Sequence, residues 1–227
     1  MKSMNHTIKN VLYLLAKRFI YKNSLTRRLV QCRYPYNLEV TQIKCLLDCI
    51  NSTRNLNGNI IEIGVARGMT TVLLNQYLKE TEDIRVYICI DTFESFTNDD
   101  IEYEITQRGK SKIDLIGFNY VDITTFRKSL EDNHLDNVVI LKKDCKKIKD
   151  NDIGRVSVAL LDVDLYLPVK KCLPILYKNL EPGGIIMVDD VKDDKIYDGA
   201  YQAYMEFCKS NGITPHYVGS KAGLLTK

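Results

Sequence analysis

From residue 59 to residue 211, short apolar runs alternate with segments of helical periodicity, and this alternation constrains the fold more than any other feature. The apolar runs predict strands at residues 59–63, 86–90, 137–142, 156–161 and 184–188. The periodic segments predict helices at residues 38–50, 69–80, 123–132, 168–179 and 199–211. Strands and helices in alternation are typical of an open, mostly parallel α/β sheet. The sequence therefore predicts a doubly wound α/β fold.

Both ends of the chain depart from this alternation. Residues 214–218 and 222–226 flank Gly219-Ser220-Lys221, which predicts an antiparallel hairpin at the C-terminus. Residues 1–35 form a basic arm, and residues 36–227 the main domain. Within residues 7–30 of the arm, apolar side chains follow helical spacing. Such a helix packs on the body, joins a second subunit in a homo-oligomer, or rests on anionic lipid, and the sequence leaves these alternatives open.

The arm and the main domain carry opposite charge. Eight basic residues precede the first acidic residue, Glu39, whereas the rest of the chain has 24 basic and 29 acidic residues. An acidic body disfavours specific binding of nucleic acid. The apolar run at residues 11–16 is too short to span a bilayer and has no cleavage site of the signal-peptide type. We therefore expect no stable membrane insertion and a cytoplasmic location.

One connection stands out because it has no clear period. Residues 93 to about 124 interleave aromatic side chains with glycine and acidic residues. A long irregular connection at the carboxyl edge of a sheet is often a lid over a binding site. The alternative is a disordered surface insertion, which the aromatic side chains disfavour.

Two acidic clusters each follow a predicted strand. Asp162 and Asp164 follow strand 156–161, and Asp189-Asp190 follows strand 184–188. If these strands are neighbours, the four carboxylates meet at one edge of the sheet, where they repel one another unless a cation joins them. Oxygen ligands favour a hard cation such as magnesium, manganese or calcium. The alternative is structural: the aspartates end strands and cap a helix.

A glycine turn follows the first predicted strand, in the pattern Glu62-x-Gly64-x-x-x-Gly68. It lacks the third glycine of the dinucleotide fingerprint and the Gly-Lys-Ser/Thr of a phosphate loop. Asp91 ends the next strand, where an acid binds ribose hydroxyls in doubly wound sheets, and Asp144 lies at the same edge. Glu62 is placed to meet a cationic group. These features suit a ligand with an ammonium group, a ribose and an adenine but no phosphate, and S-adenosylmethionine fits that description.

Several motifs together resemble the macrocin O-methyltransferase family, and the similarity extends over about residues 36 to 227. They are Ile61-Glu62-Ile63-Gly64-Val65-x-Arg67-Gly68, Asp91-Thr92-Phe93-Glu94-x-Phe96, Asp162-Val163-Asp164-Leu165-Tyr166-x-Pro168, Pro182-Gly183-Gly184 and Asp189-Asp190. The resemblance implies a Rossmann-like sheet of the class I methyltransferase type, S-adenosylmethionine as cofactor, and a divalent cation. Glu62 and Gly64 are then expected at the methionine end, and Asp91 at the ribose.

The same resemblance implies roles for the acidic clusters. Asp162, Asp189 and Asp190 are expected to ligate the metal, with Asp164 as the general base. The expected reaction is transfer of a methyl group to a hydroxyl of a sugar or a glycosylated small molecule. A metal-independent class I methyltransferase on another acceptor is one alternative. A non-catalytic nucleoside-binding or scaffolding domain is the other.

Overall fold

The structure is a computed structural model that describes residues 12, 15–16, 18–20, 22–23, 38–116, 122–193 and 196–227. The chain divides into two units, Met1–Tyr36 and Asn37–Lys227. In the first unit, residues 12, 15–16, 18–20 and 22 are helical, in agreement with a helical arm, whereas much of the predicted arm helix lies outside the described residues. No helix among the described residues is long and apolar enough to cross a membrane.

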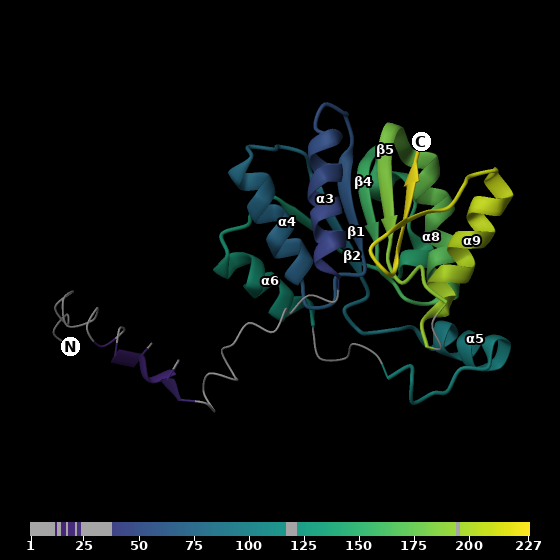
Figure 1. The fold of residues 1–227 in the computed structure, drawn as a ribbon, viewed down its shortest axis with the longest axis horizontal. Coiled ribbons are helices and arrows are strands. Elements are labelled where there is room, and N and C mark those ends of the chain that lie inside the picture. Colours follow the sequence, from purple (N-terminus) through teal and green to yellow (C-terminus); the bar gives the residue numbers. More distant parts are fainter. Residues whose placement is uncertain are drawn as a thin grey trace. The chain divides into compact units, whose positions relative to one another are not determined.

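The second unit is built on a seven-stranded sheet with the order β3-β2-β1-β4-β5-β7-β6 (Figure 1). The strands are β1 (Asn59–Ile63), β2 (Tyr87–Asp91), β3 (Val138–Lys142), β4 (Val156–Leu161), β5 (Leu180–Val188), β6 (His216–Val218) and β7 (Ala222–Thr226). The first five strands are parallel, whereas β7 pairs antiparallel with both β5 and β6. The predicted sheet and the predicted C-terminal hairpin are both confirmed.

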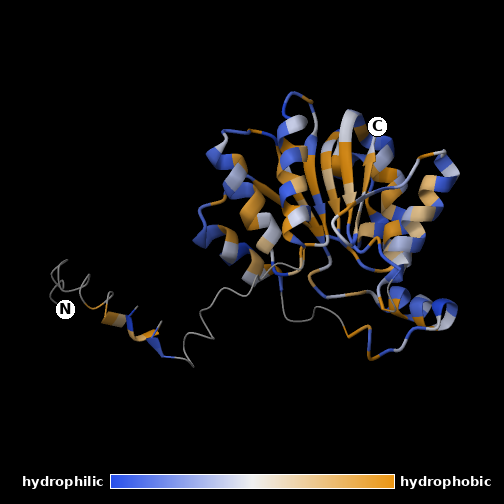
Figure 2. Cartoon of the chain, in the orientation of Figure 1, coloured by the Kyte–Doolittle hydropathy of each residue, from blue (hydrophilic) through white to orange (hydrophobic). Residues whose placement is uncertain are grey.

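Helices cover both faces of the sheet (Figure 1). Helices α3 (Val40–Ser52), α4 (Met69–Glu80) and α6 (Ile123–Asp132) lie on one face, and α8 (Tyr166–Asn179) and α9 (Asp198–Asn211) on the other. Two short elements, η1 (Cys145–Lys147) and α7 (Asp150–Ile153), connect β3 to β4. Figure 2 shows why the layers form: the strands are apolar, whereas the helices present hydrophilic residues outward.

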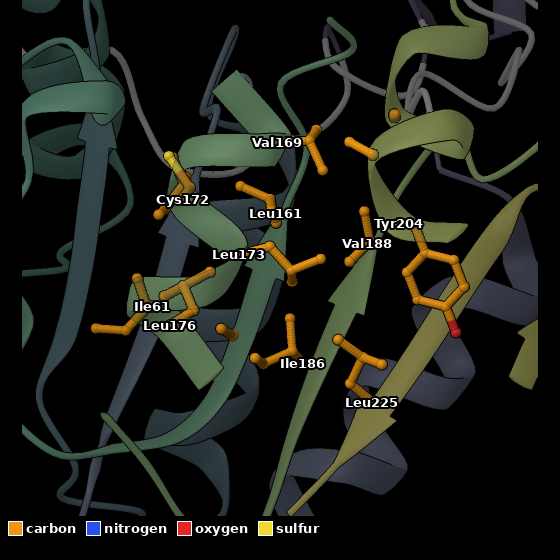
Figure 3. Close-up of a cluster of buried hydrophobic side chains, with 14 of the residues drawn as sticks. Ile61, Leu161, Val169, Cys172, Leu173, Leu176, Ile186, Val188, Tyr204 and Leu225 are labelled. Atoms are coloured by element: carbon orange, nitrogen blue, oxygen red, sulfur yellow. The ribbon is translucent and has the colours of Figure 1, made fainter. Parts of the chain in front are cut away.

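A cluster of buried apolar side chains lies between the sheet and helices α8 and α9. Side chains from β1, β4, β5 and β7 meet side chains from the two helices in this layer (Figure 3). All six residues of β4 are buried, as expected for the central strand of a doubly covered sheet. The buried layer fixes the strand ends, and these ends position the candidate site.

Besides the short elements η1 and α7, one longer helix was not predicted from the sequence: α5 (Asn98–Arg108), which lies inside the connection that was expected to be irregular. Its inward side carries charged side chains in place of apolar ones: Asp100, Glu104 and Arg108, spaced by four residues. A helix with a charged buried face gives no apolar period, which is why the hydrophobic pattern did not reveal it. Helix α5 lies beyond the carboxyl edge of the sheet (Figure 1). Residues 117–121 of the predicted lid lie outside the described residues.

Candidate active site

The four central strands end level with one another. Ile63 of β1 is paired with Ile90 of β2 and with Leu161 of β4, which in turn is paired with Val188 of β5. The residues that end or directly follow these strands form one row: Asp91, Gly64, Asp162 and Asp189. Strand register therefore brings most of the predicted site residues to one edge of the sheet.

The crevice for a ligand lies between β1 and β4. From β1 the chain builds the sheet outward through β2 and β3, and it then returns to build the other side with β4 and β5. Ligands of doubly wound sheets bind at such a reversal, outside the carboxyl ends of the strands. Gly64 lies there with a φ of +87°, and a Cβ on it would lie 1.7 Å from the carbonyl oxygen of Asp162. Only glycine allows the two strand ends to come this close.

Three carboxylates gather beside this crevice. One oxygen from each of Asp162, Asp164 and Asp190 lies within 4.8 Å of the others, and all three residues are partly exposed. Asp164 and Asp190 have φ values of 58° and 55°, in the left-handed region, where Asp is one of the few residues found with any frequency. Burial and the neighbouring carboxylates raise the pKa of Asp162 and of Asp164 well above the ordinary range of an aspartate. The cluster therefore favours binding a proton or a cation.

Asp189 differs from these three residues because both of its carboxylate oxygens are hydrogen-bonded to protein side chains. Its side chain is buried, with Oδ1 accepting a hydrogen bond from Gln42 Nε2 at 2.6 Å and Oδ2 one from Lys221 Nζ at 2.7 Å. Burial and the charge of Asp190 raise the pKa of Asp189, while Lys221 and Gln42 act in the opposite direction. The family resemblance implies Asp162, Asp189 and Asp190 as the metal ligands. The structure brings Asp162 and Asp190 together with Asp164, the expected base.

Asp91 braces the glycine turn. Its Oδ2 accepts hydrogen bonds from the backbone N–H groups of Val65 at 2.7 Å and Ala66 at 3.2 Å. Its Oδ1 accepts one from the N–H of Phe93 at 2.7 Å and a longer one from the hydroxyl of Thr92 at 3.5 Å. A carboxylate has about four acceptor positions, so a hydroxyl of a bound ribose would have to replace the long contact with Thr92. The ribose-binding role of Asp91 stays a prediction.

Glu62 is buried beside helix α4. Its Oε2 accepts hydrogen bonds from the hydroxyls of Thr71 at 2.6 Å and Tyr87 at 2.7 Å. Burial raises the pKa of Glu62 from its ordinary value of 4.5 to about 7. The structure thus places this carboxylate within the layer between strand and helix, bonded to protein groups, instead of pointing freely into the crevice.

Gly68 and Asp144, both predicted to contact the cofactor, each have a close partner within the fold, and their cofactor contacts stay predictions. Gly68 precedes α4 with a φ of +72°, and a Cβ on it would lie 2.4 Å from the ring of Phe126. Asp144 follows the edge strand β3 and accepts a hydrogen bond from the N–H of Lys146 at 3.0 Å, so it caps η1. Asp144 follows β3 beside the end of β2, where the N–H of Lys143 donates to the carbonyl of Asp91 at 2.9 Å, and Gly68 shapes the turn beside the crevice.

Three residues at the site were missed by the sequence analysis. Lys221 contacts both Asp189 and Asp190, but its sequence neighbourhood indicates only a hairpin turn. Gln42 had a signal, because it is a buried polar residue on the apolar face of a predicted helix. Tyr197 lies near Asp164 and Asp190, whose charges add to burial in raising the pKa of its phenol. Its hydroxyl donates to the carbonyl of Asp114 at 3.3 Å, which links the connection after α5 to the acidic cluster.

The arrangement fits the two groups expected from the sequence. Oxygen ligands from two neighbouring strands suit a hard divalent cation. The glycine turn, with an acid at the end of the next strand, suits a nucleoside without a pyrophosphate.

Comparison with known proteins identifies the family and the cofactor class of this chain. The family description "Macrocin-O-methyltransferase (TylF)" matches residues 39–218. Among curated proteins, no sequence matches this chain significantly. The solved structure of the O-methyltransferase NovP has a TM-score of 0.68 at 19% identity, covering 83% of this chain and 80% of NovP. The calicheamicin methyltransferase CalS11 has a TM-score of 0.66 at 16% identity, covering 100% of this chain and 94% of CalS11.

A third structure is that of an O-methyltransferase from Bacillus cereus in complex with SAH, with a TM-score of 0.55 at 15% identity. It covers 100% of this chain and 93% of that protein. At these identities the solved structures show a shared fold, and the family match extends from helix α3 to strand β6. The chain therefore belongs to the macrocin-O-methyltransferase (TylF) family and is an S-adenosylmethionine-dependent O-methyltransferase.

Proposed function

We propose that this protein methylates a hydroxyl of a sugar or a glycosylated small molecule, and that a divalent cation, most simply magnesium, assists the reaction. The observation that carries the proposal is the carboxylate triad of Asp162, Asp164 and Asp190 beside the cofactor crevice. One related structure is described as a TDP-rhamnose 3′-O-methyltransferase. A sugar acceptor for this chain is in keeping with that description and with the family.

A sugar hydroxyl holds its proton tightly, and a carboxylate with a pKa of about 4 is a weak base for it. A cation held by Asp162 and Asp190 would supply the missing acidity by lowering the pKa of the bound hydroxyl. Gly64 and Asp91 would hold S-adenosylmethionine, which would supply the methyl group. Asp164 would take the proton of the hydroxyl as the hydroxyl oxygen bonds to the methyl carbon and the carbon–sulfur bond breaks, leaving S-adenosylhomocysteine.

The environment of Asp164 suits this role. Its carboxylate has an oxygen within 4.8 Å of oxygens of Asp162 and Asp190, so it lies beside the position where a cation held by those two residues would bind the hydroxyl. Its carbonyl oxygen accepts a hydrogen bond from the N–H of Ala200 at 3.2 Å, which fixes the loop between β4 and α8 against helix α9. Positioning of the two reactants should supply much of the rate.

Two experiments test the proposal. Titration of Mg²⁺ into metal-stripped protein should release or absorb heat, and Asp162→Asn should abolish that heat. Asp164→Asn should lose at least about 100-fold in turnover, in the range of a lost general base, with unchanged affinity for S-adenosylhomocysteine. Near-native turnover of Asp164→Asn would remove Asp164 from the role of base.

One observation favours the metal-independent alternative on another acceptor. The ammonium of Lys221 lies 3.0 Å from Asp190 Oδ1, so part of the negative charge is already balanced within the protein. Turnover that is unchanged by EDTA after metal stripping would support this alternative.

A further inference from the structure

Lys221 is held at the acidic edge by the pairing of the C-terminal hairpin. Strand β7 begins at the next residue and pairs with the end of β5, where Gly223 lies opposite Val188. The N–H of Val191 donates to the carbonyl of Lys221 at 2.7 Å. The side chain is 21% exposed, and its ammonium lies 2.7 Å from Asp189 Oδ2 and 3.0 Å from Asp190 Oδ1. The hairpin thus delivers a positive charge to both residues that end β5.

A second set of bonds ties this turn to the start of helix α3. Glu39 accepts hydrogen bonds from the N–H and from the hydroxyl of Ser220, at 2.8 Å and 2.5 Å. Gly219 has a φ of +61°, and a Cβ on it would lie 2.2 Å from Glu39 Oε2, so glycine is needed for this contact. From the same helix, Gln42 bonds the other oxygen of Asp189. Lys221 is therefore anchored from two sides and is not a freely moving surface lysine.

These contacts leave Asp189 with both oxygens engaged and Asp190 with one oxygen beside an ammonium. A cation that used Asp189 would have to displace Lys221. A cation that used only the triad would still bind close to a fixed positive charge, which weakens the attraction.

We propose that Lys221 is a positioning residue that acts as an internal counter-cation. Its ammonium keeps Asp189 in an ion pair and competes with a divalent cation for Asp189 and Asp190. This inference rests on the proposed cation site. It assigns to Lys221 control over how tightly that site holds its ion, which is separate from the chemistry of methyl transfer.

The test is calorimetric titration of Mn²⁺ into the metal-stripped full chain, for the wild type and three variants. Lys221→Met removes the charge and the donor. Lys221→Gln removes the charge but keeps an amide that can donate to Asp189, in case the first variant does not fold. Lys170→Met is the matched control, because it removes one positive charge at a surface lysine that contacts Tyr166 and Glu206 instead of the acidic edge.

The expected result is that both Lys221 variants bind Mn²⁺ about tenfold more tightly or better, the scale expected for removing one close positive charge. In EDTA, the melting temperatures of the Lys221 variants should be lower than that of the wild type. Addition of Mn²⁺ should raise them by more than it raises that of the wild type, while Lys170→Met behaves like the wild type. Equal or weaker binding by folded Lys221 variants, with binding by the wild type intact, would overturn the inference and leave the proposed function standing. Absence of Mn²⁺ binding in every variant would overturn both the cation site and this inference.

Discussion

Gly64 is the residue that allows the ends of β1 and β4 to approach each other closely. It combines a positive φ of 87° with a close approach to the Asp162 carbonyl. We predict that Gly64→Ala lowers the free energy of unfolding by about 3 kcal/mol, because it adds both backbone strain and a steric clash. The control is Gly109→Ala, where φ is +68° but no atom lies within 4 Å of the added Cβ. That variant should lose only about 1 kcal/mol in urea unfolding. Equal losses in the two variants would mean that the clash at Gly64 is relieved at little cost.

Glu62 predicts a specific dependence of stability on pH. Its pKa rises from 4.5 when exposed to about 7 in the fold, so the folded state prefers the protonated form. Its contribution is fully present below pH 4.5 and is lost as the pH rises through 7. Relative to Glu62→Gln, the wild type should lose about 3 kcal/mol over this window. The measurement is the difference in the free energy of unfolding between the two proteins from pH 4.5 to pH 8. A difference that does not change with pH would show that Glu62 has the same pKa in the folded and unfolded chain.

At the level of single residues, sequence reasoning found the acids and glycines that lie directly at strand ends. Asp91, Asp162 and Gly64 could be placed because register brings such positions to one edge whatever the details of packing. Lys221 could not be placed, because its contact with Asp189 depends on how the C-terminal hairpin pairs with β5. The engagement of Asp189 by Gln42 also depends on a contact between residues 147 positions apart.

Helix α5 is the longest described helix that the sequence did not predict, and its charged side explains how it is held. Asp100 pairs with Lys146 at 2.5 Å, Glu104 with Arg108 at 2.8 Å, and Arg108 also with Asp198 at 2.6 Å. End signals were present in the sequence: Thr97 caps the first turn and Gly109 ends the helix in the left-handed region. Capping residues would have revealed this helix where hydrophobic periodicity did not.

Glu104 is the residue that links helix α5 to the start of helix α8. It is buried, and its Oε1 accepts a hydrogen bond from the N–H of Tyr166 at 2.8 Å, at the start of α8. We predict that Glu104→Ala lowers the free energy of unfolding by about 3 kcal/mol, because Arg108 and the N–H of Tyr166 lose their acceptor. Glu102→Ala, at an exposed position of the same helix, should change it by less than about 0.5 kcal/mol. Similar small effects of both substitutions in chemical unfolding would show that the charged side of α5 does not stabilise the fold.

At the scale of the whole molecule, the alternation of strands and helices was sufficient to predict the sheet, its parallel core and the closing hairpin. The pattern is strong because each central strand is buried on both faces and each covering helix on one. The order of the strands depends on a further rule: in a doubly wound sheet the chain first adds strands on one side of its first strand and then returns to add strands on the other side.

The basic arm poses a separate question of assembly. We propose that residues 1–36 contribute to association rather than to the methyltransferase fold, since the family match begins at residue 39. A chain that begins at residue 37 should keep its affinity for S-adenosylhomocysteine, and its mass in solution by light scattering should be that of a monomer. Full-length protein with the mass of a monomer would contradict a role of the arm in forming a homo-oligomer.

The central claim is that the crevice between β1 and β4 binds S-adenosylmethionine, and one titration tests it most directly. S-Adenosylhomocysteine titrated into the full chain by calorimetry should bind at a single site, and Asp91→Ala should weaken binding at least about tenfold, the loss expected for a charged hydrogen-bond partner. The control is Asp136→Ala, at an exposed aspartate just before strand β3 begins and therefore at the opposite edge of the sheet, which should bind as the wild type does. Absence of binding by folded wild-type protein, or equal binding by the Asp91 variant, would contradict the assignment of the site.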